Sequence, residues 1–118
     1  MKIVVGGHLN QDENLEIIKS IDPKIECEIM DDMTATIAVK SGKYDYYFGS
    51  CQTGAGGALA MPLAILGAAK CVSVAGPSFI LAEEIIKEKI KEGKIAFGFV
   101  PEAAEAIIPI LIRGLKED

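Results

Sequence analysis

The feature that most restricts the fold of this 118-residue chain is a repeated alternation of short apolar segments with helix-forming segments. The apolar segments have the length and the β-branched or aromatic content of strands. The alternation with short connections is typical of βαβ units. It predicts a single α/β domain over residues 1–118, a three-layer sandwich with a five-stranded, mostly parallel sheet, flavodoxin-like or Rossmann-like. The strands are expected at residues 2–6, 25–30, 44–49, 71–75 and 94–100.

Capping signals mark the first two helices. Asn10 followed by Glu13 has the spacing of a capping box, so we predict that a helix begins there and ends near residue 21. Asp31 or Asp32 can cap a second helix, and Gly42 stands where a glycine commonly follows a helix. Because this segment is rich in β-branched residues, a strand remains the alternative for it.

The other three helices are predicted at residues 58–69, 81–93 and from 101 onward. Pro62 should lie in the first turn or at a kink of its helix, and Pro109 should bend the last helix, because proline has no backbone N–H to donate. The fourth helix is amphipathic and is expected to stop at Gly93. Its predicted buried face consists of Leu81, Ile85, Ile86 and Ile90.

Charge and hydrophobicity exclude several kinds of partner. The net charge is −5 and the pI is about 4.9, without clusters of lysine or arginine, so we expect no nucleic-acid binding and no electrostatic attachment to membranes. Hydrophobic residues make up 50% of the sequence, and the mean hydropathy is +0.31. This surplus suggests an apolar face that another subunit covers, and we predict a homo-oligomer.

The apolar segment 54–76 raises the question of a membrane span. It contains Pro62, Lys70 and several glycines, which favour a buried helix followed by a buried strand, so we expect no membrane insertion. The first residues, MKIVVGGHLN, lack the long apolar core of a signal peptide. The three cysteines form no CxxC motif. These features favour a cytoplasmic protein with reduced thiols.

Parallel sheets of this type bind ligands beyond the carboxyl ends of their strands, at the point where the strand order reverses. If the five strands follow the common order 2-1-3-4-5, the first and third strands are neighbours at that point. The loops that meet there are residues 6–10 and 49–57, which are also the loops richest in glycine and polar side chains. A third loop, residues 76–78, is expected within reach of the same place.

The stretch GSCQTGAGG, residues 49–57, is suited to binding a small anion. Gly54, Gly56 and Gly57 can adopt positive φ, so that successive backbone N–H groups converge at the start of the following helix. Because the loop has no lysine or arginine, a carboxylate, a sugar or a phosphate monoester fits better than a nucleoside triphosphate. Neither the P-loop motif nor the GxGxxG dinucleotide motif is present.

These observations predict a small anionic or sugar-like ligand. No metal ion or cofactor is expected, because one histidine and scattered cysteines match no ligand spacing. Simpler interpretations remain open: the glycines can serve only to form a tight turn, and Asn10, Ser50 and Thr53 can serve only as helix caps. The candidate ligand-binding residues are Gly7, His8, Asn10, Ser50, Cys51, Gln52, Thr53, Gly54, Gly56 and Gly57.

Two side chains in these loops are candidates for catalysis. A helix N-terminus after Cys51 would lower the pKa of its thiol and make it nucleophilic, although a small buried residue is the alternative. His8, the single histidine, can act as a general acid or base or remain a solvated loop residue. Cys27 and Cys71 lie in predicted strands and are expected in the core.

Three stretches of the chain resemble the YhfU-like family of uncharacterised bacterial proteins. They are KIVVGG near the start, SGKYDYYFGSCQTGAGGALAMPLAILG in the middle and EGKIAFGF near the end, and the resemblance covers nearly the whole chain. It implies a small cytoplasmic bacterial protein with a domain of unknown function. If the glycine run marks the family's site, the matching positions are Ser50, Cys51, Thr53, Gly54, Gly56 and Gly57.

The chain is more distantly similar to the small IIB phosphocarrier components of sugar phosphotransferase systems. That similarity implies a phosphorylated cysteine in the loop after the first strand. Here this loop contains His8 and no cysteine, whereas Cys51 follows the third strand. The departure argues against phosphotransfer by a cysteine, and leaves His8 as the only phosphoacceptor in that loop.

Three hypotheses for the function follow from the sequence. The first is a module that binds a small anionic or sugar-like metabolite at residues 49–57. The second is a small transferase or phosphocarrier-like enzyme that uses Cys51 or His8. The third is a structural subunit, in which residues 58–69 and the last helix form the interface of a homo-oligomer or a larger complex.

Overall fold

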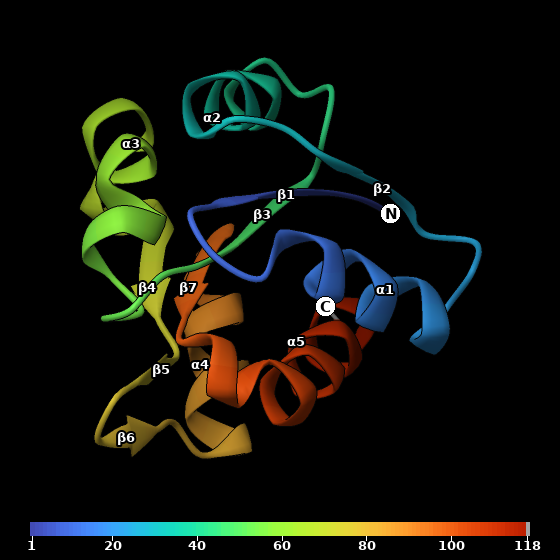
Figure 1. Ribbon diagram of the computed structural model, residues 1–118, viewed down its shortest axis with the longest axis vertical. Helices are drawn as coiled ribbons and strands as arrows, with labels where there is room; N and C mark the ends of the chain where they lie inside the picture. Colours follow the sequence, from blue (N-terminus) through green and yellow to red (C-terminus); the bar gives the residue numbers. More distant parts are fainter. Residues whose placement is uncertain (118) are drawn as a thin grey trace.

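The computed structural model describes residues 1–117, and its centre is a five-stranded parallel sheet (Figure 1). The strand order is β2-β1-β3-β7-β4, and each neighbouring pair is parallel. The α/β sandwich predicted from the sequence is therefore confirmed. The strands are β1 (Lys2–Gly7), β2 (Glu26–Ile29), β3 (Tyr46–Ser50), β4 (Cys71–Ser73) and β7 (Ala96–Phe99).

The assumed strand order is wrong in its last two positions. The segment at Cys71–Ser73 forms the edge of the sheet, and Ala96–Phe99 lies between it and β3. Burial explains the exchange: all four residues of β7 are buried, as suits an inner strand, whereas two of the three residues of β4 are only half-buried. Strands β1 and β3 are neighbours as assumed, so their loops do meet at the reversal of strand order.

Helices cover both faces of the sheet. Helices α1, α4 and α5 pack together on one face, and α2 and α3 pack together on the other (Figure 1). Short 3₁₀ turns at Ala68–Lys70 and Pro101–Ala103 complete the connections. The helices are α1 (Gln11–Ile21), α2 (Asp32–Lys40), α3 (Gly56–Leu66), α4 (Glu83–Lys91) and α5 (Ala104–Glu117).

The capping predictions have mixed outcomes. Asp31 caps α2, since its carboxylate accepts from the backbone N–H of Thr34 at 3.0 Å, and Gly42 follows the helix with φ +82°. The helical interpretation of this segment is thereby confirmed over the strand. The capping box at Asn10 does not form: Asn10 has φ 63° and makes no side-chain cap, and its amide donates to the side chain of Asn14 instead.

Helix α3 accommodates its proline through a tyrosine in the sheet. The helix begins at Gly56, so Pro62 lies in its interior rather than in its first turn. Proline leaves the carbonyl four residues earlier, that of Ala58, without its helical donor. The hydroxyl of Tyr47, a fully buried residue of β3, donates to this carbonyl at 2.6 Å. A buried side chain thus replaces the missing backbone hydrogen bond.

A hairpin that the sequence did not predict follows β4. Its strands are β5 (Ala75–Gly76) and β6 (Phe79–Ile80), which pair antiparallel beyond the main sheet. The predicted strand 71–75 is therefore divided, and α4 starts two residues later than expected. Gly93 follows α4 with positive φ as predicted, but Ile85 is 39% exposed and does not belong to the buried face.

The apolar face of the last helix is not available to a partner. Its large side chains are buried inside the chain, in the core between the sheet and α1, so the apolar stripe that suggested an oligomer interface is already covered within the chain. Helix α3 is different, because it contains no charged residue and leaves Leu63 exposed. Within residues 1–117, none of the helices combines the length and the apolar character needed to cross a bilayer.

Candidate functional site

The loops after β1 and β3 enclose a pocket of about 340 Å³ at the carboxyl ends of these strands. Six of the ten candidate residues line it, and one apolar residue, Leu9, joins them. Leu9 was not a candidate because an apolar side chain carries no chemical signal in the sequence. The six candidate residues in the lining are His8, Cys51, Gln52, Thr53, Gly56 and Gly57.

The other four candidates lie behind the pocket wall and shape it. The buried hydroxyl of Ser50 donates to the carbonyl of Leu9 at 2.6 Å and accepts from the amide of Asn14 at 3.0 Å. The amide of Asn10 donates to the same Asn14 side chain at 2.9 Å. These bonds hold the loop after β1 against the end of β3, and Asn14 is a structural residue that sequence reasoning missed.

Glycine is required at Gly7 and Gly54 by conformation and by close approach. Gly7 has φ +82°, and a side chain there would overlap the backbone of Ser50. Gly54 has φ +78°, and a side chain there would overlap the carbonyl of Ala75. Neither residue lines the pocket, so these two glycines act as packing devices, which was the simpler interpretation left open for them.

Thr53 caps helix α3. Its hydroxyl oxygen accepts from the backbone N–H of Gly56 at 3.0 Å and from that of Ala55 at 3.3 Å. Ser50 does not take part in this cap, because its hydroxyl is engaged with the loop after β1. Two of the N–H groups expected to face an anion are thus bonded within the loop.

Cys51 lies in the wall of the pocket and is only 5% exposed. Its Sγ is 3.5 Å from the hydroxyl oxygen of Thr53. Burial raises the pKa of the thiol, but hydrogen bonds from the Thr53 hydroxyl and from the backbone of Ala58, Thr53 and Gly54 together bring the pKa below its ordinary value. The donors at the start of α3 therefore converge on this sulfur and favour its thiolate.

The other two cysteines behave as core residues, as predicted. Burial raises the pKa of Cys27 to about 11, and it also raises the pKa of Cys71. Both thiols are buried in the sheet and stay protonated near neutral pH. The three cysteines are thus distinguished by their surroundings, and Cys51 alone has a pKa below the ordinary value of a thiol.

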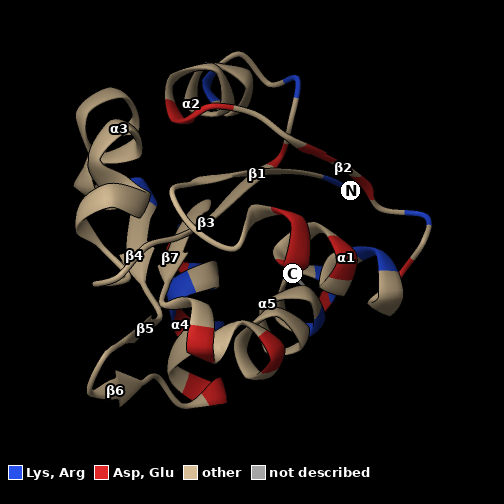
Figure 2. Ribbon diagram, in the orientation of Figure 1, with Lys and Arg blue, Asp and Glu red and all other residues tan. Residues whose placement is uncertain are grey.

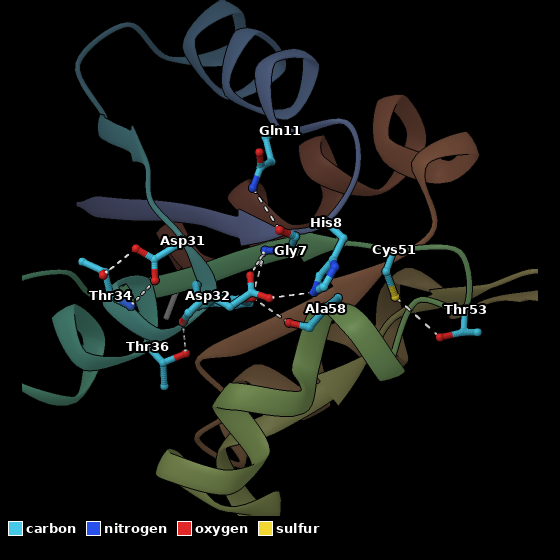
Figure 3. Close-up of polar contacts among 11 residues, drawn as sticks. Gly7, His8, Gln11, Asp31, Asp32, Thr34, Thr36, Cys51, Thr53 and Ala58 are labelled. Atoms are coloured by element: carbon cyan, nitrogen blue, oxygen red, sulfur yellow. Dashed lines mark hydrogen bonds and ion pairs between the residues drawn. The ribbon is translucent and has the colours of Figure 1, made fainter.

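His8 stands at the mouth of the pocket and is held by a carboxylate from α2. Its Nε2 is 2.9 Å from Oδ2 of Asp32, while the other carboxylate oxygen accepts from the backbone N–H of Gly7 at 2.6 Å (Figure 3). The side chain of His8 is 61% exposed and that of Asp32 only 18%. Asp32 was considered only as a helix cap, although its place after β2, beside the reversal of strand order, was a signal for the site.

A second pocket of about 500 Å³ lies beside the β5–β6 hairpin. The loop 76–78, expected near the first pocket, lines this one instead, together with Phe79, Ile80 and residues that follow β7. Its one charged lining residue is Glu102. Residues 1–117 contain no group of three or more histidine, cysteine or acidic side chains placed to hold a metal ion.

Comparison with known sequences places the chain in a family. The sequence-family model described as "Protein of unknown function DUF2620" matches residues 1–115. The chain belongs to the DUF2620 family. It is 42% identical over 116 residues to the "Uncharacterized protein YhfU" of Escherichia coli K12 and to that of Shigella flexneri, with 98% of each chain covered. The resemblance to the YhfU-like family is therefore confirmed.

Solved structures show where the fold occurs elsewhere. Ribose-5-phosphate isomerase B of Clostridium thermocellum aligns with a TM-score of 0.67 and 16% identity, over 99% of this chain and 92% of its own. Ribose-5-phosphate isomerase B of Giardia lamblia aligns with a TM-score of 0.64 and 18% identity, over 95% and 94% of the two chains. At these identities the similarity shows a shared fold.

Proposed function

We propose that this DUF2620 protein binds a small sugar-like phosphate monoester in the pocket between the loops after β1 and β3. The observation that carries the proposal is the lining of this pocket, in which side-chain donors and glycine backbone meet at the reversal of strand order and no lysine or arginine is present. Such a lining suits hydroxyl groups and one weakly charged anion. The shared fold with enzymes named for ribose 5-phosphate supports the choice of that compound as a probe.

Thermal unfolding with ribose 5-phosphate tests the proposal, with ribose and inorganic phosphate as partial probes. A ligand at one hundred times its dissociation constant adds about 2.7 kcal/mol to the stability of the folded state. Gly56→Val should abolish the shift, because Gly56 lines the pocket, and outside its own helix an added Cβ would meet only Oγ1 of Thr53, at an ordinary contact distance of 3.4 Å. Ser78→Val, in the second pocket, is the matched control. A shift that persists in Gly56→Val would contradict the assignment of the pocket.

We propose as a second candidate that the bound sugar is isomerised with Cys51 as the base. The observation that favours it is the lowered pKa of this pocket-lining thiol. The thiolate would remove the proton from C2, next to the carbonyl group, and the resulting thiol would return a proton to C1, the former carbonyl carbon, while the proton of the C2 hydroxyl moves to the original carbonyl oxygen, so that the aldose becomes the ketose. Loss of the C2 proton signal of ribose 5-phosphate in D₂O measures this step. Exchange that survives Cys51→Ser would exclude Cys51 as the base.

We also propose self-association through the outer surface of α2 and α3. Met33, Ile37 and Leu63 are 52%, 51% and 44% exposed there, and α3 carries no charge in a chain of net charge −5 (Figure 2). Two copies that meet through α3 bring uncharged helices together, so no charge repulsion arises between these helices. Light scattering should give a particle larger than 12.6 kDa, which Ile37→Glu returns to the monomer mass. A monomer at micromolar concentration would contradict this proposal of self-association.

We further propose a cytoplasmic location, which the free cysteines fit.

A further inference from the structure

We propose that Asp32 is a positioning residue that fixes the tautomer of His8, so that Nδ1 of the imidazole accepts a hydrogen bond from a hydroxyl group of the ligand. This inference rests on the proposed function for its ligand, a sugar-like molecule in the pocket between the loops after β1 and β3. It assigns a role to a carboxylate that lies outside the glycine-rich loop. It also names the part of the ligand that the loop after β1 would recognise.

The carboxylate of Asp32 is held in place from both sides. Its Oδ1 accepts from the backbone N–H of Gly7 at 2.6 Å and lies 3.4 Å from the hydroxyl of Tyr47. That hydroxyl donates its proton to Ala58 and accepts from the N–H of Gly7, so the carboxylate borders a buried network. A carboxylate fixed in this way presents Oδ2 to His8 in one orientation, at 2.9 Å from Nε2.

The ring of His8 has one contact that orients it and one nitrogen left for the pocket. A carboxylate only accepts hydrogen bonds, so the neutral imidazole must carry its proton on Nε2, and Nδ1 then has a free lone pair. Within residues 1–117, Nδ1 has no hydrogen-bond partner. Figure 3 shows the ring between Asp32 and Cys51, and both His8 and Cys51 lie within 3.4 Å of the position of a Cβ on Gly57. The imidazole of His8 and the side chain of Cys51 therefore border the same small space.

The network also predicts the effect of replacing the carboxylate by an amide. In Asp32→Asn the group at the position of Oδ1 faces the N–H of Gly7 at 2.6 Å, and an NH₂ group cannot accept from it, so the amide oxygen takes this position and the NH₂ group faces His8. An NH₂ group can only donate to Nε2. The histidine must then carry its proton on Nδ1, and its lone pair no longer faces the ligand. The substitution is expected to reverse the tautomer and to leave the ring in place.

The single histidine of the chain makes this reversal measurable. Long-range ¹H–¹⁵N correlation spectra, recorded well above the ordinary histidine pKa of about 6.5, distinguish the two tautomers. We expect the Nε2–H form in the wild type and the Nδ1–H form in Asp32→Asn. Asp31→Asn is the matched control, because it removes the neighbouring carboxylate charge, can still cap α2 and does not contact His8. It should keep the Nε2–H form.

Binding of ribose 5-phosphate then tests the role toward the ligand. Asp32→Asn should weaken binding about tenfold, and Asp31→Asn should not. Stronger binding in Asp32→Asn would show that the carboxylate acts only by repelling the anion, and unchanged binding would show that Nδ1 makes no ligand contact. Either result overturns the inference, as does an Nδ1–H form in the wild type.

The tautomer measurement separates this inference from the proposed function. If the wild-type protein fails to bind ribose 5-phosphate, the proposed ligand is contradicted, and the tautomers of the wild type and Asp32→Asn alone decide the role of Asp32. Reversal of the tautomer supports that role, and an unchanged tautomer overturns it. If Asp32→Asn fails to fold, the tautomer of the wild-type protein still decides the outcome.

Discussion

The two pockets at the carboxyl ends of the strands differ in the hydrogen bonds and other contacts that support their lining residues. The pocket beside the hairpin is the larger of the two, at about 500 Å³, and it is lined by Pro77, Phe79, Ile80 and residues that follow β7, with Glu102 as its one charge. The pocket of about 340 Å³ at β1 and β3 contains a histidine whose Nε2 contacts Asp32 and a cysteine whose Sγ contacts Thr53. Size alone would select the pocket beside the hairpin, whereas these polar contacts favour the pocket at β1 and β3.

The difference lies in rigidity as well as in chemistry. Hydrogen bonds among Asp32, Tyr47, Gly7 and Ala58 hold the residues behind the first pocket, and Asn14 with Ser50 holds its loop. The wall of the second pocket depends on exposed side chains of a two-stranded hairpin. A site that must orient a small ligand needs the first kind of support. The following predictions test this contrast, from the largest expected effect to the smallest.

Gly54→Ala should destabilise the protein by about 3 kcal/mol or more. Gly54 has φ +78°, and its added Cβ would overlap a backbone carbonyl that cannot move. Gly76→Ala, in the second pocket, should cost about 1 kcal/mol, because the atoms it meets belong to the exposed side chain of Phe79, which can rotate away. Denaturant unfolding of the two variants measures the difference.

Gly42→Ala separates conformational strain from overlap, because Gly42 has φ +82° with open space around it. We expect a cost of about 1 kcal/mol from backbone strain alone. Equal costs in Gly54→Ala and Gly76→Ala would show that the backbone contact at Gly54 adapts as readily as the side-chain contact at Gly76. The contrast drawn between them would then be lost.

Tyr47→Phe should lower the free energy of unfolding by about 1–3 kcal/mol. It removes the donor to the Ala58 carbonyl, which Pro62 cannot replace, and leaves a buried acceptor unsatisfied. Tyr44→Phe is the matched control, since the hydroxyl of Tyr44 bonds only to the exposed carboxylate of Glu28. Urea denaturation compares them, and an equal, small loss in both variants would contradict the role given to Tyr47.

Thr53→Val should slow the alkylation of Cys51 near neutral pH. The Thr53 hydroxyl is the largest influence that lowers the pKa of this thiol, so its loss raises the pKa and reduces the thiolate fraction at a given pH. Alkylation rates from mass spectrometry across a pH series measure the change, and Cys27, with a pKa of about 11, is the unreactive internal reference. A rate profile that Thr53→Val leaves unchanged would contradict the hydrogen bond as the cause.

Glu102→Gln should change the affinity for ribose 5-phosphate by less than about twofold. Glu102 is the charge of the second pocket, so removing it would strengthen binding noticeably only if the anion were bound there. A titration followed by calorimetry is sufficient to measure the ratio. A severalfold increase in affinity would indicate that ribose 5-phosphate binds in the pocket beside the hairpin.

The sequence allowed the fold class to be predicted because its signals are local. Apolar segments, capping residues and glycines at positive φ each act within a few residues. Most of the observed helix and strand boundaries therefore differ from the predicted ones by only one or two residues. The strand order of β4 and β7 was not predictable in the same way, because it depends on how deeply each strand is buried in the complete sheet. The hairpin at Ala75–Ile80 was missed because its strands have two residues each.

The candidate site was predictable in its location and not in its internal connections. Glycine and polar residues in the two loops identified the six lining residues His8, Cys51, Gln52, Thr53, Gly56 and Gly57. The sequence predicted that a helix N-terminus after Cys51 would lower the pKa of its thiol, but it did not indicate that the hydroxyl of Thr53 would be the largest of the lowering influences. Nor did it pair Asp32 with His8, because the two residues come from different loops and meet only in the folded chain.

The most direct test of the account is a titration of ¹⁵N-labelled protein with ribose 5-phosphate, followed by amide chemical shifts. If the smaller, rigid pocket is the site, the largest changes should fall on His8, Gln52, Gly56 and Gly57. They should disappear in Gly56→Val and persist in Ser78→Val. Changes centred on residues 76–80 and 100–103, around the larger pocket, would contradict the central claim.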